Sequence, residues 1–472
     1  MKFRKLATIL VISSVVAATF VGCGSSKKDS GASNKEEAAA TEDVAPDNFP
    51  EKLTAKKINS IDVDMLYTGM GGMYYKDDSG KYGIMTFDGK KDTGAKYAYC
   101  EGADKYFVVS DTTIKDAKDV EELNSNGLVD AEGNEIIPQA YATIKVLSER
   151  YAKVSEVTET TVIEDDAIVY FHSGSISFGP QEGDTLFKGN WYIYDLSTGE
   201  KVEGVTGTKG YSISVNGNYI SYITDAQERM CVNADGKKLP EGAKLLENGS
   251  YTLVENNEGT VYSTEDEKLF TYKVNGFVPE YYEEGYYVGT MTNNTKKYVL
   301  MDEKGSVVSA EFEKYPHVYG TMLWVEDKVY DFECNQVIEG SYEYVYLDKK
   351  TNNCWFLKNE QEQVFINEDG DVLYKVENTD DIIVDTANFL SKNGDGKYYS
   401  LKDNDFVFEG YGIAPWLVKA NAENNLSNII DVISGETIIE SYSSYSYGGH
   451  NQTTTYIYAK KVDGGIDIYT VK

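Results

Sequence analysis

The sequence predicts an all-β fold, namely a β-propeller-like repeat array of about seven to ten blades of roughly 38 residues each. Three observations support this prediction. A strand-turn-strand pattern recurs along the chain, the composition combines 42 Gly and 39 Tyr with only 8 Pro, and helical periodicity is nearly absent. Aromatic residues favour strands and Gly allows the backbone conformations of tight turns, so this composition is typical of a chain made of hairpins.

The first 22 residues have the order of an export signal. Lys2, Arg4 and Lys5 form a basic start, an apolar run covers residues 6–21, and small Gly22 follows. A membrane-spanning helix needs about 20 strongly apolar residues. Since hydroxylated residues interrupt this run, we expect residues 1–22 to be a cleaved signal peptide in preference to a permanent transmembrane anchor.

The segment Phe20-Val21-Gly22-Cys23 resembles the lipobox of bacterial lipoproteins, with Phe20 where lipoboxes usually carry Leu. The resemblance implies that Cys23 is acylated by diacylglycerol, with acyl chains such as palmitate, and becomes the new N-terminus after cleavage. Each buried CH₂ contributes about 0.8 kcal/mol, and two chains anchor stably where one is marginal. We therefore expect a lipid-anchored protein on the extracytoplasmic face of the cell membrane. The alternative is an ordinary secretory signal that contains a cysteine.

Residues 23–50 are predicted to form a disordered tether that leads to a β-repeat domain, residues 51–472. The tether is rich in Gly, Ser, Lys, Glu, Ala and Asp and has almost no apolar side chains to bury. Apolar burial therefore cannot offset the entropy lost when such a segment folds. We expect the tether to hold the β domain away from the lipid headgroups.

The repeat consists of a short apolar strand, often ending in Asp or Asn, a turn with Gly, and a second apolar strand. Asp-Gly and Gly-Asn pairs supply the positive φ that tight hairpins require. The nine intervals from Gly89 to Gly435 average about 38 residues, the size of a four-stranded propeller blade. The ten turns are marked by Gly89, Gly133, Gly199, Gly236, Glu267, Gly305, Asn335, Gly370, Asn404 and Gly435.

Some segments depart from the repeat. The largest interval between turns contains an insertion around residues 158–190, and the clearest helical segment is 116–124. The chain ends in a strand-like segment, residues 465–471, while another, residues 61–67, precedes the first repeat. If the last strand completes a blade begun by the first strands, the ring closes and no strand edge is exposed. We therefore predict a closed propeller in preference to an open solenoid.

The segment Gly127-Leu-Val-Asp-Ala-Glu-Gly-Asn-Glu-Ile-Ile-Pro-Gln-Ala-Tyr141, followed by Ile144 and Tyr151-Ala-Lys-Val154, resembles the bacterial WG repeat. That motif consists of Trp-Gly, two apolar residues and Asp, then a Gly turn, an Ile-Pro step and a Tyr. Tyr82-Gly83 stands where the Trp-Gly pair would be, and no unit has the Trp. The resemblance implies a surface-exposed interaction module that carries no catalytic residues.

The chain is strongly acidic, with a formal net charge of −32. A surface this negative repels nucleic acid and anionic lipid, so neither is an expected partner, and the charge serves solubility or cation capture. Apart from Cys23, the cysteines are too few for a disulfide framework and lack zinc-site spacing. We expect small buried hydrophobic residues, with the disulfide state left open. They are Cys100, Cys231, Cys334 and Cys354.

Residues for catalysis are in short supply. The three histidines, His172, His317 and His450, have no partners at triad or metal-ligand spacing, and no nucleophile-elbow, P-loop or zincin motif occurs. The Asn-x-Asp-Gly turns lack the full spacing of a calcium loop and are predicted to be plain hairpins. We expect no catalytic residues, no metal and no cofactor. Paired carboxylates such as Asp165-Asp166 keep open an extracytoplasmic propeller enzyme acting on carbohydrate.

Tyrosine is concentrated in two runs, residues 280–287 and 441–450. Strand packing explains most tyrosines, but aromatic rings with hydrogen-bonding tips also suit the recognition of a glycan or a peptide. The candidate binding residues are Tyr281, Tyr282, Tyr286 and Tyr287 in the first run and Tyr442, Tyr445 and Tyr447 in the second.

These patterns together predict a cell-surface lipoprotein whose non-catalytic propeller binds a protein or glycan at the envelope. One alternative is the carbohydrate-active propeller enzyme. Another is a solute-binding lipoprotein of a transporter, but such folds are mostly α/β, and the near absence of helices argues against it.

Overall fold

The computed structural model describes most of residues 52–472, all within one compact unit, Asp43–Lys472. The predicted signal peptide and tether, with Cys23, lie outside the described residues. Among the described residues, no helix has the length and apolar character needed to cross a bilayer. The gaps in the description are residues 114–116, 163–168, 173–174, 179–184, 209–212, 292–296, 349–353, 368–369, 378–382, 386–389, 393–397, 401–405, 409, 415–416, 433 and 452–453.

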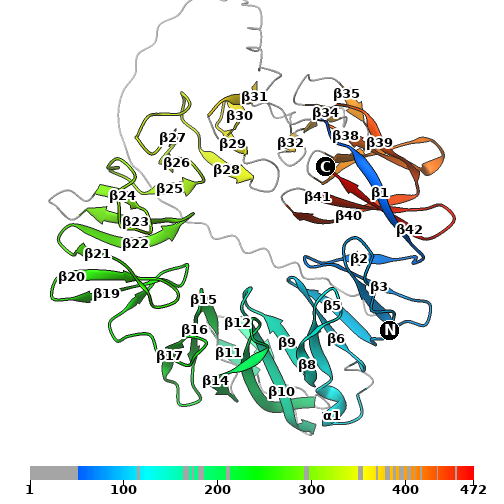
Figure 1. The fold of residues 1–472 in the computed structure, drawn as a ribbon, viewed down its shortest axis with the longest axis horizontal. Coiled ribbons are helices and arrows are strands. Elements are labelled where there is room, and N and C mark those ends of the chain that lie inside the picture. Colours follow the sequence, from blue (N-terminus) through cyan, green and yellow to red (C-terminus); the bar gives the residue numbers. More distant parts are fainter. Residues whose placement is uncertain are drawn as a thin grey trace, which may run out of the picture. The chain divides into compact units, whose positions relative to one another are not determined.

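The described residues form eleven antiparallel sheets of three or four strands and one separate two-stranded hairpin. Each of the four three-stranded sheets is extended by isolated bridges, such as that between Tyr82 and Tyr97, so a four-stranded unit recurs throughout. Figure 1 shows the sheets following one another in chain order. The predicted all-β, propeller-like repeat fold is confirmed.

We number the sheets 1 to 11 in chain order. Sheet 1 contains β2 (Leu66–Thr68), β3 (Met73–Lys76) and β4 (Tyr82–Met85); sheet 2 contains β5 (Tyr99–Ala103), β6 (Tyr106–Ser110), β7 (Asn126–Val129) and β8 (Glu135–Tyr141). Sheet 3 contains β9 (Thr143–Val146), β10 (Tyr151–Val162), β13 (Thr185–Asp195) and β14 (Glu200–Gly207); sheet 4 contains β15 (Ser214–Asn216), β16 (Tyr219–Ile223) and β17 (Arg229–Val232).

The middle of the chain continues the series. Sheet 5 contains β18 (Lys244–Leu245), β19 (Tyr251–Glu255), β20 (Glu258–Tyr262) and β21 (Lys268–Lys273); sheet 6 contains β22 (Phe277–Glu283), β23 (Tyr286–Met291) and β24 (Lys297–Met301). Sheet 7 contains β25 (Pro316–Tyr319), β26 (Met322–Val325) and β27 (Lys328–Tyr330); sheet 8 contains β28 (Tyr344–Asp348), β29 (Cys354–Lys358), β30 (Glu362–Ile366) and β31 (Val372–Glu377).

The last three sheets complete the array. Sheet 9 contains β32 (Ile383–Asp385), β33 (Leu390–Lys392), β34 (Tyr398–Ser400) and β35 (Phe406–Phe408); sheet 10 contains β36 (Gly410–Ala414), β37 (Leu417–Asn421), β38 (Ser427–Asp431) and β39 (Thr437–Tyr442). Sheet 11 contains β40 (Ser444–Asn451), β41 (Thr454–Lys460), β42 (Ile466–Val471) and β1 (Ala55–Ile61). The remaining elements are the hairpin of β11 (Val169–His172) and β12 (Ser175–Phe178), the short helix α1 (Val120–Leu123) and a 3-10 turn (Glu423–Asn425).

The turn between the third and fourth strands uses the same chemistry in several sheets. Its first side chain accepts hydrogen bonds from backbone N–H groups two and four residues later, as Asp302 does from Lys304 (3.0 Å) and Ser306 (2.8 Å). The fourth residue of this turn, Gly305, has a φ of 80°, which Gly adopts without a Cβ penalty. The turn of Asn233 has the same bonds, in agreement with its interpretation as a hairpin.

The two ends of the β domain meet in sheet 11. β1 pairs antiparallel with β42 over six residue pairs, and Figure 1 shows blue β1 beside red β42. The buried carboxylate of Asp467 in β42 accepts hydrogen bonds from Lys57 (2.6 Å) and Ser60 of β1 and from Tyr442 (2.7 Å) of sheet 10. The predicted closure by the N- and C-terminal strands is therefore present, and a buried polar cluster supports it.

The number of sheets is larger than the predicted seven to ten. Nine of the ten turns recognised in the sequence belong to sheets 1 to 8 and sheet 10, where each turn leads from the third strand to the fourth. The tenth, marked by Asn404, lies outside the described residues. In sheet 11 the fourth strand is β1, so the chain ends take the place of this turn. A count of turns therefore misses the closing sheet.

Apolar clusters join successive sheets. Ile84 and Phe107 belong to the cluster between sheets 1 and 2, and Met73 and Ile468 to the cluster that joins sheet 1 to sheet 11. Among the described residues, such clusters link eight pairs of successive sheets. Sheets 1, 2, 3, 6, 7 and 11 consequently have an apolar cluster on each of their two faces.

The cysteines differ in exposure. Cys100 is buried as predicted, Cys231 is half-buried, and Cys334 is exposed at a turn where its φ is 67°. All three are free thiols. The prediction of a buried hydrophobic role is wrong for Cys334, because it lies in a hairpin turn at the surface. The side chain of Cys354 lies outside the described residues.

Candidate binding cleft in sheet 3

The second tyrosine run packs mainly between sheets 10 and 11. Tyr445 is 8% exposed and belongs to an apolar cluster on which Tyr447 also packs. The hydroxyl of Tyr442 donates to Asp467 and shares a hydrogen bond of 2.7 Å with the hydroxyl of Tyr469. The prediction that Tyr445 is a surface platform is wrong, because the neighbouring sheet covers its ring.

The first tyrosine run is divided between the two faces of sheet 6. Tyr287 is 1% exposed in the cluster between sheets 5 and 6, which excludes it as a binding platform. Tyr282 donates to Glu303 (2.9 Å), and the ring of Tyr286 packs edge-on against Phe332. Of the four candidates in this run, only Tyr281 is exposed, with 43% of its surface accessible to solvent. It therefore stays a candidate contact residue.

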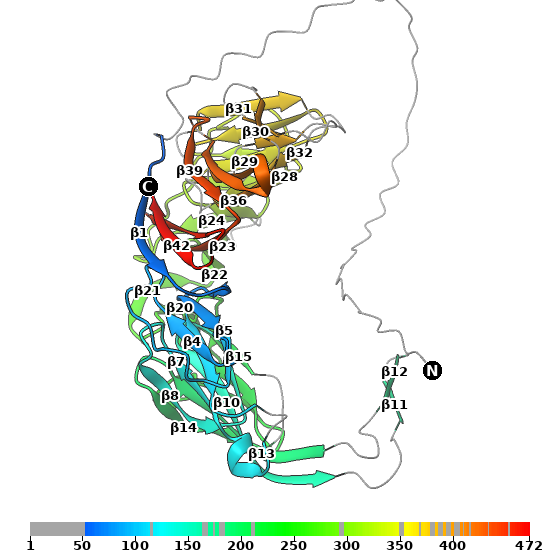
Figure 2. The ribbon, with the colours of Figure 1, turned by 90° about the vertical axis from the view of Figure 1, so that its right-hand side faces the viewer.

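Sheet 3 departs from the repeat where the sequence predicts an insertion. Its central strands β10 and β13 pair at eleven positions, from Tyr151 opposite Asp195 to Val162 opposite Thr185. The neighbouring strand β9 pairs with only four residues of β10, which end at Ser155. The ribbon of β10 and β13 therefore extends beyond the rest of the sheet (Figure 2).

A β-bulge between Val157 and Glu159 marks the base of this ribbon. Two hydrogen bonds from the side chain of Asn124 hold the bulge in place. Its Nδ2 donates to the carbonyl of Val157 (2.7 Å), and its Oδ1 accepts from the N–H of Val157 (2.8 Å). Asn124 directly follows α1, whose N-cap Asp119 accepts from the N–H of Glu122 (2.9 Å). The connection between β6 and β7 thus supports the inserted ribbon.

Gly189 lies opposite Val157 in the ladder between β10 and β13. A Cβ at this position would lie 1.6 Å from the carbonyl oxygen of Glu156, which is a backbone atom that cannot turn aside. Only Gly allows the two backbones to approach this closely. The bulge and the glycine together set the path of both strands at the base of the ribbon.

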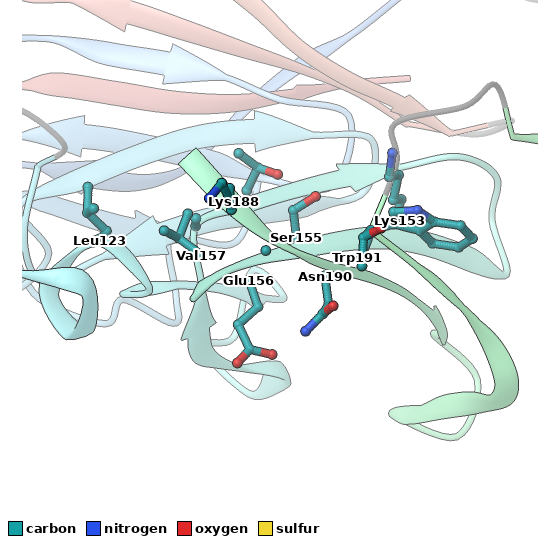
Figure 3. Close-up of a pocket in the computed structure, with 12 residues that line it drawn as sticks. Leu123, Lys153, Ser155, Glu156, Val157, Lys188, Asn190 and Trp191 are labelled. Atoms are coloured by element: carbon teal, nitrogen blue, oxygen red, sulfur yellow. The ribbon is translucent and has the colours of Figure 1, made fainter. Parts of the chain in front are cut away.

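A cleft of about 310 Å³ lies at this base (Figure 3). Strand alternation places Lys153, Ser155 and Val157 on one face of β10, and Trp191 of β13 lies opposite Ser155. Seven of the twelve lining residues have polar or charged side chains, but most of the surface that the lining exposes to the cleft is apolar, as in sites that bind small ligands. The lining residues are Leu123, Ala142, Thr143, Lys153, Ser155, Glu156, Val157, Lys188, Gly189, Asn190, Trp191 and Thr208.

The two lysines of the cleft differ in their partners. Lys188 Nζ pairs with the carboxylate of Glu159 at 3.1 Å. Lys153 forms no ion pair with a described residue, and its Nζ lies 5.6 Å from the centroid of the buried Trp191 ring. Burial lowers the pKa of Lys153, and the ammonium of Lys145, which lies opposite on β9, lowers it further.

A second cavity, of about 570 Å³, lies among turns of sheets 1 and 2 and Tyr456 of sheet 11. It contains three lysines, but Lys90 pairs with Asp88 (2.8 Å) and the ammonium of Lys91 lies 3.9 Å from Glu132. Most of its positive charge is therefore already neutralised within the protein. The third lysine, Lys105, forms no ion pair with a described residue either, so the cleft of sheet 3 is distinguished by the more apolar surface of its lining. For this reason the cleft of sheet 3 is the better candidate for a binding site.

Sequence patterns indicated the insertion but none of the residues of the cleft. Lys153 and Trp191 occupy ordinary positions of alternating strands. The one sequence feature that could have pointed to them is that both flank the interruption of the repeat.

Within the described residues, no three His, Cys, Asp or Glu side chains are grouped so that they could hold a metal ion.

Comparisons with known proteins give no family. No family model and no curated protein matches the chain. BamB from Moraxella catarrhalis is 10% identical over 88% of this chain and 97% of its own, with a TM-score of 0.21. A eukaryotic initiation factor is 11% identical over 73% and 92%, with a TM-score of 0.30, and AztD from Citrobacter koseri is 11% identical over 60% and 94%, with a TM-score of 0.20. At these TM-scores the likeness carries no argument, and the propeller assignment rests on the strand pairing.

Proposed function

We propose that this chain is a lipoprotein anchored through Cys23 on the extracytoplasmic face of the membrane, and that its propeller binds a protein or glycan at the envelope without catalysis. The cleft of sheet 3 is the observation that carries the binding function. Insertions in repeat arrays often build the binding face, and the largest insertion of this chain has the cleft at its base. The lipobox-like segment supports the location.

The cleft suits recognition because strands hold its side chains in place. β10 and β13 are joined by eleven ladder pairs, and Asn124 fixes the bulge between them. Little ordering of the site is then needed when a partner binds, which favours affinity. A volume of about 310 Å³ is at the lower end of the range of ligand pockets, so the cleft would hold one end or one side group of a larger partner.

The anchoring is tested by the variant Cys23→Ser. We expect the wild-type protein in the membrane fraction and the variant in the soluble extracytoplasmic fraction, because the variant lacks the thiol that carries the acyl chains. Immunoblots of cell fractions measure this distribution. Cys231→Ser, in the β domain, is the control and is expected to stay on the membrane. Retention of Cys23→Ser on the membrane would contradict the proposal.

The binding function is tested by filling the cleft. Ser155→Phe places a ring on the cleft face of β10, whereas Thr160→Phe places the same ring on an exposed part of that strand, outside the cleft lining. Glycan arrays and peptide arrays measure binding by the full chain. We expect Ser155→Phe to lower the array signal at least about tenfold and Thr160→Phe to leave it unchanged.

Two outcomes of the array experiment would contradict the proposal. If Ser155→Phe and Thr160→Phe bind every probe as the wild type does, the cleft is not the binding site. If the wild type releases products from a bound glycan, the protein is a carbohydrate-active enzyme. Matched melting temperatures of the two variants are the control for folding.

A further inference from the structure

We infer that the cleft of sheet 3 binds the C-terminal carboxylate of a peptide or protein whose last residue is apolar. This inference rests on the proposed binding function and names the chemistry of its ligand. Two features of the cleft carry it, namely an amine that has no ionic partner among the described residues and a lining whose exposed surface is mainly apolar.

The amine belongs to Lys153. The chain has 77 Asp and Glu against 45 Lys and Arg, yet no described carboxylate pairs with this side chain. Lys188, at the same cleft, already pairs with Glu159. Figure 3 shows Lys153 beside Trp191, whereas Glu156 points away from both. A ligand carboxylate would supply the missing ionic partner, and a charge-assisted hydrogen bond is strengthened in desolvated surroundings.

The lining of the cleft indicates which kind of chemical group lies next to the ligand carboxylate. Leu123, Val157 and Trp191 contribute apolar surface to the cleft, and an apolar side chain next to the carboxylate would be buried against them. An acidic sugar has hydroxyl groups around its ring, and those that face Leu123, Val157 and Trp191 would lose their hydrogen bonds. A terminal carboxylate beside an apolar side chain matches both features.

The size of the cleft agrees with a chain end. About 310 Å³ accommodates one or two amino-acid residues. Capture of a C-terminal carboxylate is a recurring mode of peptide recognition, in which the end of the partner chain is bound and the preceding residues stay outside. The hydroxyls of Thr143 and Ser155, opposite each other on β9 and β10, are available to the second carboxylate oxygen.

The experiment uses the full chain in detergent and measures fluorescence polarisation. The probes are N-terminally labelled hexapeptides ending in Leu, Ile or Phe, each prepared as the free acid and as the C-terminal amide. We expect the free acids to bind at least about tenfold more tightly than the amides. Lys153→Met keeps the aliphatic stem and should remove this preference. Lys145→Met removes an equal charge from the opposite residue on β9, outside the cleft lining, and should retain it.

The outcomes separate this inference from the proposed function. Equal binding of acids and amides, weakened by Ser155→Phe, would overturn the inference and leave the cleft as a binding site. Binding of oligogalacturonate but of no peptide, weakened by Ser155→Phe, would show a glycan ligand and would also overturn it. If Ser155→Phe weakens no probe, both proposals fail. A preference for acids that Lys153→Met abolishes and Lys145→Met keeps supports the inference.

Discussion

Tyrosine hydroxyls in this protein repeatedly donate to carboxylates that lie between strands or sheets. Asp266, in the turn of sheet 5, accepts from Tyr219 of sheet 4 (2.6 Å) and from Tyr251 (3.0 Å). In sheet 1, burial and the carboxylate of Asp92 raise the pKa of Tyr75 to about 12, so its hydroxyl remains a protonated donor near neutral pH. Part of the abundance of acidic residues and tyrosine is thereby explained by packing.

The fourth residue of the turn between the third and fourth strands of a sheet allows a test of stability by single substitutions. Cys334 has a φ of 67° there, is exposed, and stands where other turns have Gly. The left-handed conformation costs a non-glycine residue about 1 kcal/mol or more. We expect Cys334→Gly to raise the free energy of unfolding by up to about 1 kcal/mol, measured by urea denaturation.

Asp266 provides the matched comparison for this test. It occupies the same turn position with a φ of 62°, but its carboxylate holds Tyr219, Tyr251 and Lys237. Asp266→Gly should therefore lower the urea midpoint, although it relieves the same backbone strain. If both glycine variants are more stable than the wild type, backbone conformation outweighs these hydrogen bonds.

The buried carboxylates of Asp195 and Asp467 predict sensitivity to acid. Burial would raise the pKa of each, but hydrogen bonds from Arg150 to Asp195 and from Lys57 to Asp467, among others, hold both pKa values below the usual range. A carboxyl whose pKa is lower in the folded state stabilises the protein above its unfolded pKa near 4. This stabilisation is lost as the pH falls through the folded pKa.

We expect the urea midpoint to fall when the pH is lowered from 7 to 3. Asp467→Asn should be less stable than the wild type at pH 7 and should show a smaller difference between the two pH values. Asp463→Asn, in the turn before β42, is the control, because Asp463 is exposed. An undiminished difference in Asp467→Asn would show that this carboxylate does not contribute to the acid response.

At the scale of elements, covered sheet faces explain why the tyrosine predictions failed. Successive residues of a strand point to opposite faces, and in this array both faces of most sheets pack on a neighbour. Tyr287 consequently lies between sheets 5 and 6, whereas Tyr286 lies between sheets 6 and 7. A surface for binding arises where an element extends beyond its neighbours, as β10 and β13 do in sheet 3.

The inserted ribbon depends on the close approach of its two backbones. Gly189→Ala would place a Cβ 1.6 Å from the carbonyl oxygen of Glu156, so the strands must separate at the bulge. We expect a loss of about 2 to 3 kcal/mol in stability, together with weaker ligand binding at the cleft. Gly102→Ala in β5 is the control, because the nearest atom to its Cβ is 3.8 Å away. Equal stability of the two variants would contradict the predicted clash.

At the scale of the whole molecule, closure depends on β1. Deleting residues 52–61 would remove the fourth strand of sheet 11 and expose the edge of β42, which is a template for pairing with another chain. We expect the melting temperature to fall by at least about 5 °C and dimers or larger species to appear in light-scattering chromatography. A monomer with the melting temperature of the wild type would show that sheet 11 does not need β1.

The periodic features were predictable from the sequence because they depend on neighbouring residues. The strand-turn-strand pattern indicated the propeller-like fold, and the longest interval between turns located the insertion in sheet 3. The closing sheet escaped the count, since its first and last strands come from opposite ends of the chain. The cleft escaped for a similar reason, because its lining combines the helix α1, the connection between β8 and β9, strands of sheet 3 and the residue that follows β14.

Local chemistry along the chain was sufficient to specify strands, hairpin turns and the repeat, because alternation and positive φ act over a few residues. The tertiary structure decided which tyrosines are covered, how β1 closes the array, and that Lys153 lies beside Trp191 without a carboxylate partner among the described residues. These properties depend on which sheet packs against which, and burial is a property of the assembled neighbours rather than of any one segment.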